Sequence, residues 1–199
     1  MPVFGAIPFG NEFHATLRSL EADPDAPGFS DVGLRNLVFT HVLNLRPEAV
    51  LEIGSHIGTA SVVIGQALKL NGFGRLFTVE PQAHYQGKVE HYVRMAGVGE
   101  FVEVVKGFSH EGGVRDRLRS KGPFELIFVD ANHDYVAVKE DIRFCWSVLA
   151  NDGFLLFHDT SRSSQSLDSE GRGGCAQRSS RRRKRFPTSG WFRMSTRSG

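Results

Sequence analysis

The run Val-Leu-Glu-Ile-Gly-Ser-His-Ile-Gly at residues 50–58 has the residue types best suited to hold a small ligand. An apolar strand ends there, and Gly54 and Gly58 follow before a helix with apolar periodicity. Glycines in a strand-to-helix turn let a ligand approach the main chain closely and place it at a helix N-terminus. The acidic Glu52 suits a cationic or hydroxyl-bearing ligand better than a pyrophosphate, because like charges repel. The turn predicts a ligand site, although an ordinary strand-to-helix turn would use similar residues.

Polar side chains also follow the other predicted strands. Glu80 comes 22 residues after Gly58, and a carboxylate there can accept hydrogen bonds from both hydroxyls of a ribose. Ser109 follows the third strand and could pair with the edge of an adenine or simply form a turn. Asp130 ends the fourth strand, where it could meet an amino group, a metal or a substrate, or cap the next helix. Their repetition at successive strand ends favours a shared site.

Strands and helices alternate from residue 30 to residue 160, and this organisation would bring the polar side chains together. The strands are continuous apolar runs, as a parallel sheet covered on both faces requires. We expect an α/β fold with an open, doubly wound, mostly parallel sheet that binds ligands beyond the carboxyl ends of its strands. The expected strands cover residues 49–53, 75–80, 101–105, 124–130 and 153–158. The expected helices lie between Ser30 and Pro47 and over residues 59–70, 83–96, 114–119 and 135–149.

Length and composition fit one globular domain. The chain has 199 residues, 40% of them apolar, which is enough for a hydrophobic core. It has no apolar run of the ~18 residues that a membrane helix needs, and residues 1–10 lack the basic and apolar regions of a secretory signal. The two cysteines, Cys145 and Cys175, indicate neither a metal site nor a disulfide framework. These patterns favour a cytoplasmic protein without a membrane partner.

Together, Glu52-x-Gly54-x-x-x-Gly58, Glu80, the loop of residues 107–109 and Asp130 resemble a class I S-adenosylmethionine-dependent methyltransferase. The resemblance covers roughly residues 34–160. The endings Asp130-x-x-His133-x-Tyr135 and His158-Asp159 are similar to those of small-molecule and sugar O-methyltransferases. The resemblance implies a Rossmann-like fold with strand order 3-2-1-4-5, S-adenosylmethionine as the cofactor, and methyl transfer to a hydroxyl of a small molecule or sugar. It implies that the cofactor-binding residues are Glu52, Gly54, Ser55, Gly58, Glu80, Ser109 and Asp130.

The same resemblance indicates catalytic residues after the fourth and fifth strands. Methyl transfer from a sulfonium is an in-line displacement, and a general base assists when the nucleophile is a hydroxyl. His133 is the first candidate for that base and His158 the second, since an imidazole titrates near neutrality, and a structural role for either stays open. Related catechol-type enzymes hold a divalent metal on acids that correspond to Asp130 and Asp159, a pair that would favour Mg²⁺. Their third ligand is usually an amide or an acid, whereas this chain has Thr160, so a metal-free site is an open alternative.

The charge pattern divides the chain near Thr160. Residues 1–160 carry 14 basic and 20 acidic side chains, a net charge of −6, whereas residues 161–199 carry 10 basic and 2 acidic ones, a net charge of +8. This tail has ten serines, nine arginines and too few apolar residues to order itself. It could be a basic arm that contacts nucleic acid or a membrane surface, a solvated extension, or a product of out-of-frame translation that replaces the natural C-terminus, and we favour the last.

The expected organisation is an N-terminal segment over residues 1–29, a methyltransferase domain over 30–160 and a disordered tail over 161–199. The antiparallel strand pair that usually follows the fifth strand in this family is expected to be missing. An NAD-type Rossmann oxidoreductase is one alternative, but Gly-x-Gly-x-x-Gly is required and residues 54–58 lack its middle glycine. A non-catalytic nucleic-acid-binding protein is another, but the acidic charge of residues 1–160 confines nucleic-acid contacts to the tail. The acceptor and the oligomeric state, a homo-oligomer included, stay open.

Overall fold

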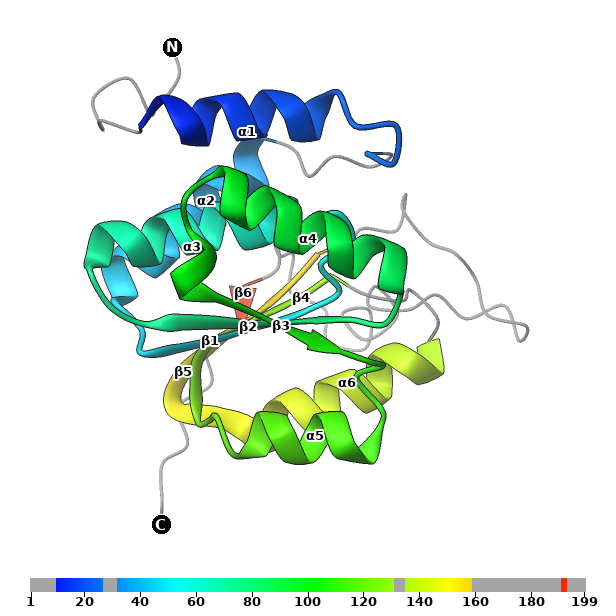
Figure 1. Cartoon of the computed structure of the whole chain (residues 1–199). Helices are drawn as coiled ribbons and strands as arrows, with labels where there is room; N and C mark the ends of the chain where they lie inside the picture. The colour runs from blue at the N-terminus through cyan, green and yellow to red at the C-terminus, as the bar shows by residue number, and fades with distance from the viewer. Residues whose placement is uncertain (1–9, 27–31, 131–134, 159–190, 193–199) are drawn as a thin grey trace.

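The computed structural model describes residues 10–26, 32–130, 135–158 and 191–192, in which helices surround one sheet (Figure 1). What the sequence predicts for His133, Asp159, Thr160 and most of the tail lies outside these residues. The helices are α1 (Asn11–Glu21), α2 (Val32–Leu45), α3 (Thr59–Asn71), α4 (Ala83–Met95), α5 (Gly112–Arg119) and α6 (Tyr135–Val148), with a short 3₁₀ helix η1 (Gly99–Phe101). The strands are β1 (Ala49–Ile53), β2 (Arg75–Glu80), β3 (Val102–Lys106), β4 (Phe124–Val129), β5 (Leu149–Phe157) and β6 (Trp191–Phe192).

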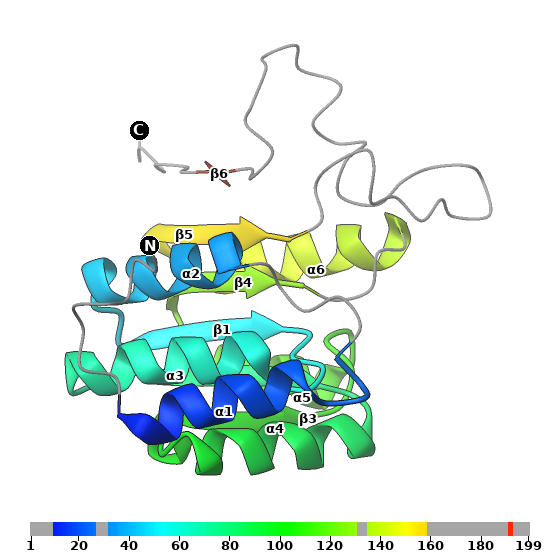
Figure 2. The same cartoon turned by 90° about the horizontal axis from the view of Figure 1, so that it is seen from above.

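The sheet has the strand order β3-β2-β1-β4-β5-β6, and β1 to β5 are parallel. The predicted order 3-2-1-4-5 is therefore confirmed. The order reverses at β1, which pairs with β2 on one side and with β4 on the other. A doubly wound sheet binds its ligands at such a switch point, beyond the carboxyl ends of the strands. In Figure 2 the arrowheads of β1, β4 and β5 all point toward this edge.

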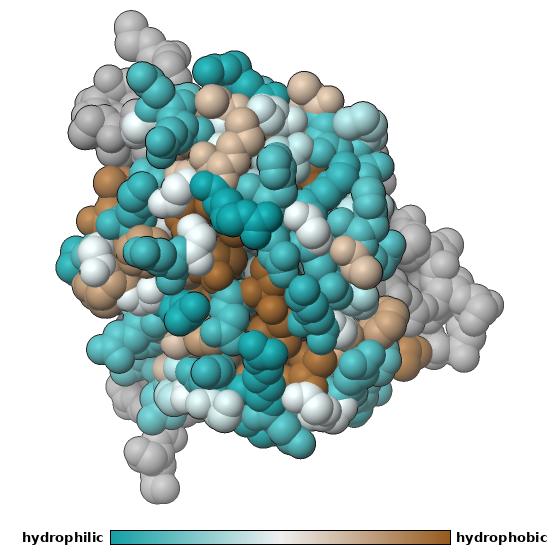
Figure 3. Space-filling model, viewed as in Figure 1, coloured by the Kyte–Doolittle hydropathy of each residue, from teal (hydrophilic) through white to brown (hydrophobic). Residues whose placement is uncertain are grey.

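Side chains alternate along the strands and build a hydrophobic core on each face of the sheet. Val50 belongs to the core beneath α2, α3 and α4, whereas its neighbour Leu51 belongs to the core beneath α5 and α6. Figure 1 shows the corresponding layers, with α1 to α4 on one face and α5 and α6 on the other. This double covering explains the continuous apolar runs of the strands. In the same view, Figure 3 shows a mainly hydrophilic surface with apolar residues near its middle, between the two helical layers.

The N-terminal segment contains a helix, α1, that the apolar pattern did not indicate. It packs against α3 and α4 and buries Phe13, Thr16 and Leu20. In the loop that follows, the Asp23 carboxylate accepts hydrogen bonds from the Lys88 ammonium and the Tyr92 hydroxyl of α4. The position of α1 thus depends on polar contacts with α4 as well as on apolar burial.

The far edge of the sheet differs from the expectation in two ways. β5 begins at Leu149 rather than at residue 153, because Leu149 already pairs with Phe124 before the register shifts. Beyond β5 lies β6, whose two residues pair antiparallel with Leu155 and Leu156. The described part of the tail therefore contributes one short antiparallel strand at an edge where the sequence pattern predicted none.

Candidate functional site

The predicted ligand-binding residues gather at the carboxyl edge of the sheet. Main-chain hydrogen bonds continue the parallel pairing one residue beyond β1, β4 and β5. Their donor nitrogens lie 2.9–3.1 Å from the acceptor oxygens. The bonds run from Gly54 to Val79, from Asp130 to Ile53 and from His158 to Val129. The first residues after these strands, Gly54, Asp130 and His158, are consequently held side by side, as expected from a parallel sheet.

The glycine turn between β1 and α3 requires an unusual backbone. Gly54 and Gly58 have φ angles of 89° and 93°, in the left-handed region that glycine adopts without steric cost. Gly58 is the residue that precedes α3, and a Cβ there would lie 3.2 Å from the Cα of Val89. His56 between them also has a positive φ, 50°, and its ring lies against Tyr85 with 4.2 Å between ring centroids. Both glycines are therefore required by the turn itself.

Glu80, at the end of β2, holds this turn. Its Oε2 accepts a hydrogen bond from the backbone N–H of His56, and its Oε1 accepts one from the backbone N–H of Gln82, both at 2.9 Å. Burial raises the pKa of Glu80 above its ordinary value, while the bonds from Gln82 and His56 oppose that rise. Each carboxylate oxygen accepts only one of these bonds and has a second lone pair for a ligand hydroxyl. Glu80 can thus shape the turn and bind a ligand at once.

Glu52 is a fully buried carboxyl at the same place. Its Oε2 accepts hydrogen bonds from the hydroxyls of Ser61 and, at 2.6 Å, Thr78. Burial raises the pKa of Glu52 to about 7, aided by the negative charges of Asp130 and Glu80. Three acidic groups therefore meet around the glycine turn, and a cation bound there would relieve their repulsion.

Two buried polar atoms of the β1–α3 segment have no hydrogen-bond partner within the described residues. They are Oε1 of Glu52 and Oγ of Ser55. A buried polar atom without a partner costs about 1–3 kcal/mol, so a ligand that supplies partners would be favoured here. This feature fits a ligand that carries hydrogen-bond donors, such as an ammonium group.

The loop between β3 and α5 is tied to α6 by a contact that the sequence analysis missed. The Ser109 hydroxyl donates a hydrogen bond to Asp141 Oδ1 at 2.6 Å, and the guanidinium Nε of Arg115 donates one to the Ser109 carbonyl at 3.0 Å. Asp141 is 4% exposed and lies on the buried stripe of α6. An acid on an otherwise apolar stripe, with Val138, Phe144, Cys145 and Val148, was the available sequence signal.

Asp130 and His158 are brought together by the pairing of β4 and β5. His158 Nδ1 lies 3.0 Å from Asp130 Oδ1, and both side chains are partly exposed. His133 and Asp159, the other predicted catalytic and metal-binding residues, lie outside the described part of the chain. Among the residues described, no group of three histidine, cysteine or acidic side chains is placed to hold a metal.

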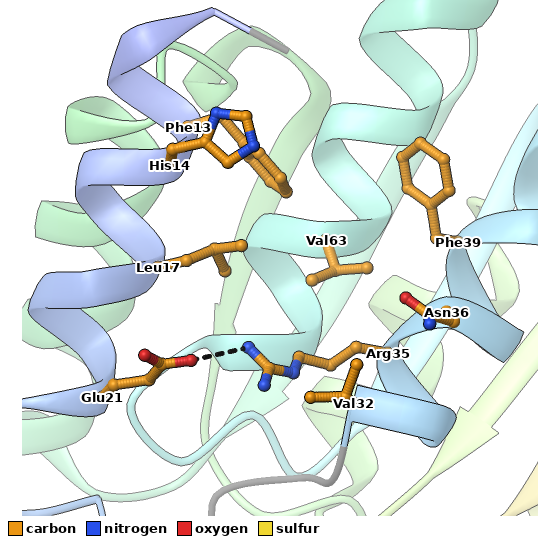
Figure 4. A pocket seen from close by; sticks show the side chains of 9 residues that line it. All are labelled: Phe13, His14, Leu17, Glu21, Val32, Arg35, Asn36, Phe39 and Val63. Carbon is orange, nitrogen blue, oxygen red and sulfur yellow. Dashed lines mark hydrogen bonds and ion pairs between the residues drawn. The ribbon is translucent and has the colours of Figure 1, made fainter. Parts of the chain in front are cut away.

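A separate apolar pocket lies on the helical face rather than at this edge. It is enclosed by α1, α2 and α3 and contains none of the predicted site residues (Figure 4). The Arg35 guanidinium spans it to reach Glu21, with 3.3 Å between Nη1 and Oε1. Its lining residues are Phe13, His14, Leu17, Glu21, Val32, Arg35, Asn36, Phe39 and Val63. Five of these described lining side chains are apolar, and the four polar ones are His14, Glu21, Arg35 and Asn36. Separately, none of the described helices combines the length and the apolar character that a membrane span needs.

Comparison with known proteins identifies a family for more than half of the chain. Residues 51–160 match the family model described as "Methyltransferase domain", and this match runs from within β1 to beyond the end of β5. A "Transmembrane O-methyltransferase homolog" from Rattus norvegicus is 38% identical over 76 residues, which are 38% of this chain and 28% of that protein. The chain therefore aligns with little more than a quarter of that relative.

Solved structures share the fold at low sequence identity. An O-methyltransferase from Bacillus cereus, in complex with SAH, superposes with a TM-score of 0.66 at 17% identity, over 80% of this chain and 71% of that one. The O-methyltransferase TomG from Streptomyces achromogenes, in complex with SAM, gives a TM-score of 0.62 at 20% identity, over 76% and 66%. The family match covers more than half of the chain, and it spans the glycine turn, the buried acids and the Asp130–His158 pair. The chain belongs to the methyltransferase-domain family.

Proposed function

We propose that this protein transfers the methyl group of S-adenosylmethionine to a hydroxyl of a small molecule or sugar. The observation that carries the proposal is the convergence of Glu52, Glu80 and Asp130 around the glycine turn. S-adenosylmethionine carries two cationic centres, a sulfonium and an ammonium, which such a site would attract. The pyrophosphate of NAD is anionic and would be repelled. The charge of the site thus supports the sulfonium cofactor over a dinucleotide.

The cofactor-binding residues are assigned to the parts of the cofactor by the family resemblance, and their chemistry supports the assignment. Gly54, Ser55 and Gly58 leave the main chain open to the methionine portion, and Glu52 Oε1 is an acceptor for its ammonium group. Glu80 accepts hydrogen bonds from the ribose hydroxyls through the lone pairs that His56 and Gln82 do not use. Ser109, in the β3–α5 loop, is assigned by the resemblance to the edge of the adenine.

The Asp130–His158 pair is proposed to handle the proton of the acceptor. Bound S-adenosylmethionine supplies an electrophilic methyl group on a sulfonium that leaves as a neutral thioether. His158 Nδ1 lies 3.0 Å from Asp130 Oδ1, and in the tautomer with the proton on Nδ1 it donates a hydrogen bond to Asp130. In that tautomer Nε2 is the basic nitrogen, and the Asp130 carboxylate would stabilise the imidazolium formed when the hydroxyl proton is taken up. Asp130 is thereby the residue that orients this base. His133, the first candidate from the sequence, lies outside the described residues and stays a candidate for the same step.

Calorimetric titration of the full chain with S-adenosylmethionine, S-adenosylhomocysteine and NAD tests the cofactor. We expect both sulfur ligands to bind and NAD not to. Glu90→Gln removes one negative charge from α4, outside the site, and is the control for a general effect of charge. It should bind both sulfur ligands as the wild-type chain does. Preferential binding of NAD would refute the proposal.

A second assay tests the acceptor. The chain is incubated with S-adenosylmethionine and a panel of catechols, simple phenols and sugars, and the release of S-adenosylhomocysteine is measured for each. Release that depends on a hydroxyl-bearing acceptor supports the proposed reaction class. Release with thiols or amines, and with no hydroxyl compound, would contradict it while leaving the cofactor assignment standing.

A further inference from the structure

The β3–α5 loop is held at three points, and each is an ordinary hydrogen bond. The backbone N–H of Gly107 donates to the carbonyl of Glu80 at 3.2 Å, which links the loop to the acid assigned to the ribose. Arg115 donates to the Ser109 carbonyl, and Ser109 donates to Asp141. A Cβ on Gly107, whose φ is 130°, would lie 2.7 Å from Glu111 Oε2. The loop therefore has little freedom to shift relative to Glu80.

The direction of the Ser109 bond decides what its hydroxyl offers to a ligand. A hydroxyl has one hydrogen and two lone pairs, and an ionised carboxylate can only accept. Burial raises the pKa of Asp141 above its ordinary value, and the bond from Ser109 and the charge of Arg115 oppose that rise without cancelling it. The bond runs from the Ser109 hydroxyl to Asp141 Oδ1, so the carboxyl oxygen is the acceptor. With its hydrogen committed to Asp141, Ser109 presents lone pairs to its partly exposed side.

We infer that Asp141 is a positioning residue which fixes the Ser109 hydroxyl as a hydrogen-bond acceptor and thereby selects a purine with an amino group over one with an oxo group. Adenine presents an N–H donor at its exocyclic position, whereas hypoxanthine presents an acceptor there. An acceptor meets a donor in the first case and another acceptor in the second, where both groups lose their water without gaining a bond. The inference rests on the proposed function, because it assumes that Ser109 faces the purine.

Asp141→Asn tests the direction of the bond with almost no change in volume. An amide NH₂ can donate to Ser109, so the hydroxyl hydrogen is released to point toward the purine. Ser109→Ala removes the hydroxyl altogether and leaves the Asp141 carboxyl in place. Glu140→Gln is the matched control, since Glu140 lies on the same helix and pairs with Arg143 on the solvent side. Removing its charge acts only to lower the pKa of Asp141, which keeps Asp141 an acceptor for the Ser109 hydroxyl.

The affinities of S-adenosylhomocysteine and its inosine analogue are measured by calorimetry for all four proteins, with circular dichroism as the check on folding. We expect the wild-type chain and Glu140→Gln to prefer the adenine ligand by roughly tenfold or more, the scale of one hydrogen bond. Asp141→Asn and Ser109→Ala should both reduce that ratio toward one. Equal losses for the two ligands, with an unchanged ratio, would overturn the inference and leave Asp141 as a structural residue. Binding of both ligands to the wild-type chain without preference would also overturn it, whereas no binding of either would overturn the proposed function as well.

Discussion

Replacing the buried carboxyl of Glu52 by an amide should change how the stability of the ligand-free protein depends on pH. The pKa of Glu52 rises from its ordinary 4.5 to about 7 in the folded protein, chiefly because the group is buried. A raised pKa means that the folded state holds the proton more tightly than the unfolded state. This contribution to stability is therefore fully present below pH 4.5 and is lost as the pH rises through about 7.

The size of the effect follows from the two pKa values. At about 1.4 kcal/mol for each pH unit between them, ionising Glu52 costs the folded state about 3 kcal/mol. Glu52→Gln has no proton to lose, and its amide oxygen can still accept the bonds from Ser61 and Thr78. As the pH rises from 5 to 8, the free energy of unfolding of the variant should therefore increase by about 2–3 kcal/mol relative to that of the wild-type chain.

Urea unfolding of both proteins at several pH values from 5 to 8 measures this difference. The difference between the two free energies of unfolding removes the contributions of the other groups that titrate in that range. Glu48→Gln is the control. Glu48 is exposed and immediately precedes β1, at the end opposite the glycine turn, so its substitution should leave the difference between pH 5 and pH 8 as it is in the wild-type chain. A difference between wild type and Glu52→Gln that stays constant from pH 5 to pH 8 would refute the reasoning.

Four further outcomes are expected. Binding of cationic S-adenosylmethionine should release a proton from Glu52 near pH 6–7, detected as a calorimetric enthalpy that depends on the ionisation enthalpy of the buffer, and Glu52→Gln should abolish the release. Glu80→Ala should weaken cofactor binding by ~1.5–3 kcal/mol with an unchanged far-ultraviolet circular dichroism spectrum, and an unchanged dissociation constant would reduce Glu80 to a loop acid. His158→Ala should lower turnover ~10²–10⁴-fold at constant cofactor affinity, whereas parallel losses of rate and affinity would move it to the binding site. Burial acts to raise the pKa of Asp23, but the hydrogen bonds from Lys88 and Tyr92 outweigh burial and lower this pKa to about 2. The ionised Asp23 carboxylate therefore stabilises the fold above pH 3.8, and this stabilisation is lost as the pH falls through about 2. Acid titration should therefore show that Asp23→Asn and the wild-type chain converge in stability at low pH, and a constant gap would contradict this.

Much of the site could be predicted because it consists of residues adjacent to strands. The expected bounds of β1 and β2 agree with the structure, and Glu52, Glu80 and Asp130 lie at the sheet edge where strand ends were expected. Apolar runs and turn residues are local features, and a parallel sheet converts the ends of separate strands into neighbours. The confirmed strand order places these residues next to one another at that edge.

The partners of those residues could not be predicted in the same way. Glu80 accepts a hydrogen bond from the backbone of His56, 24 residues earlier. This bond depends on a left-handed turn whose shape the sequence only suggests. α1 was missed because its burial comes from α3 and α4, which the chain supplies much later.

The class of fold, the glycine turn and the positions of the acids could be predicted from local sequence, since each depends on the preferences of neighbouring residues. The tertiary structure alone decided which polar atoms find partners: Ser109 with Asp141, 32 residues apart, His158 with Asp130, 28 apart, and Glu52 Oε1 with no partner among the described residues. The reason is physical. Hydrogen bonds act over about 3 Å, so whether one forms is settled only when packing has brought distant segments to that separation.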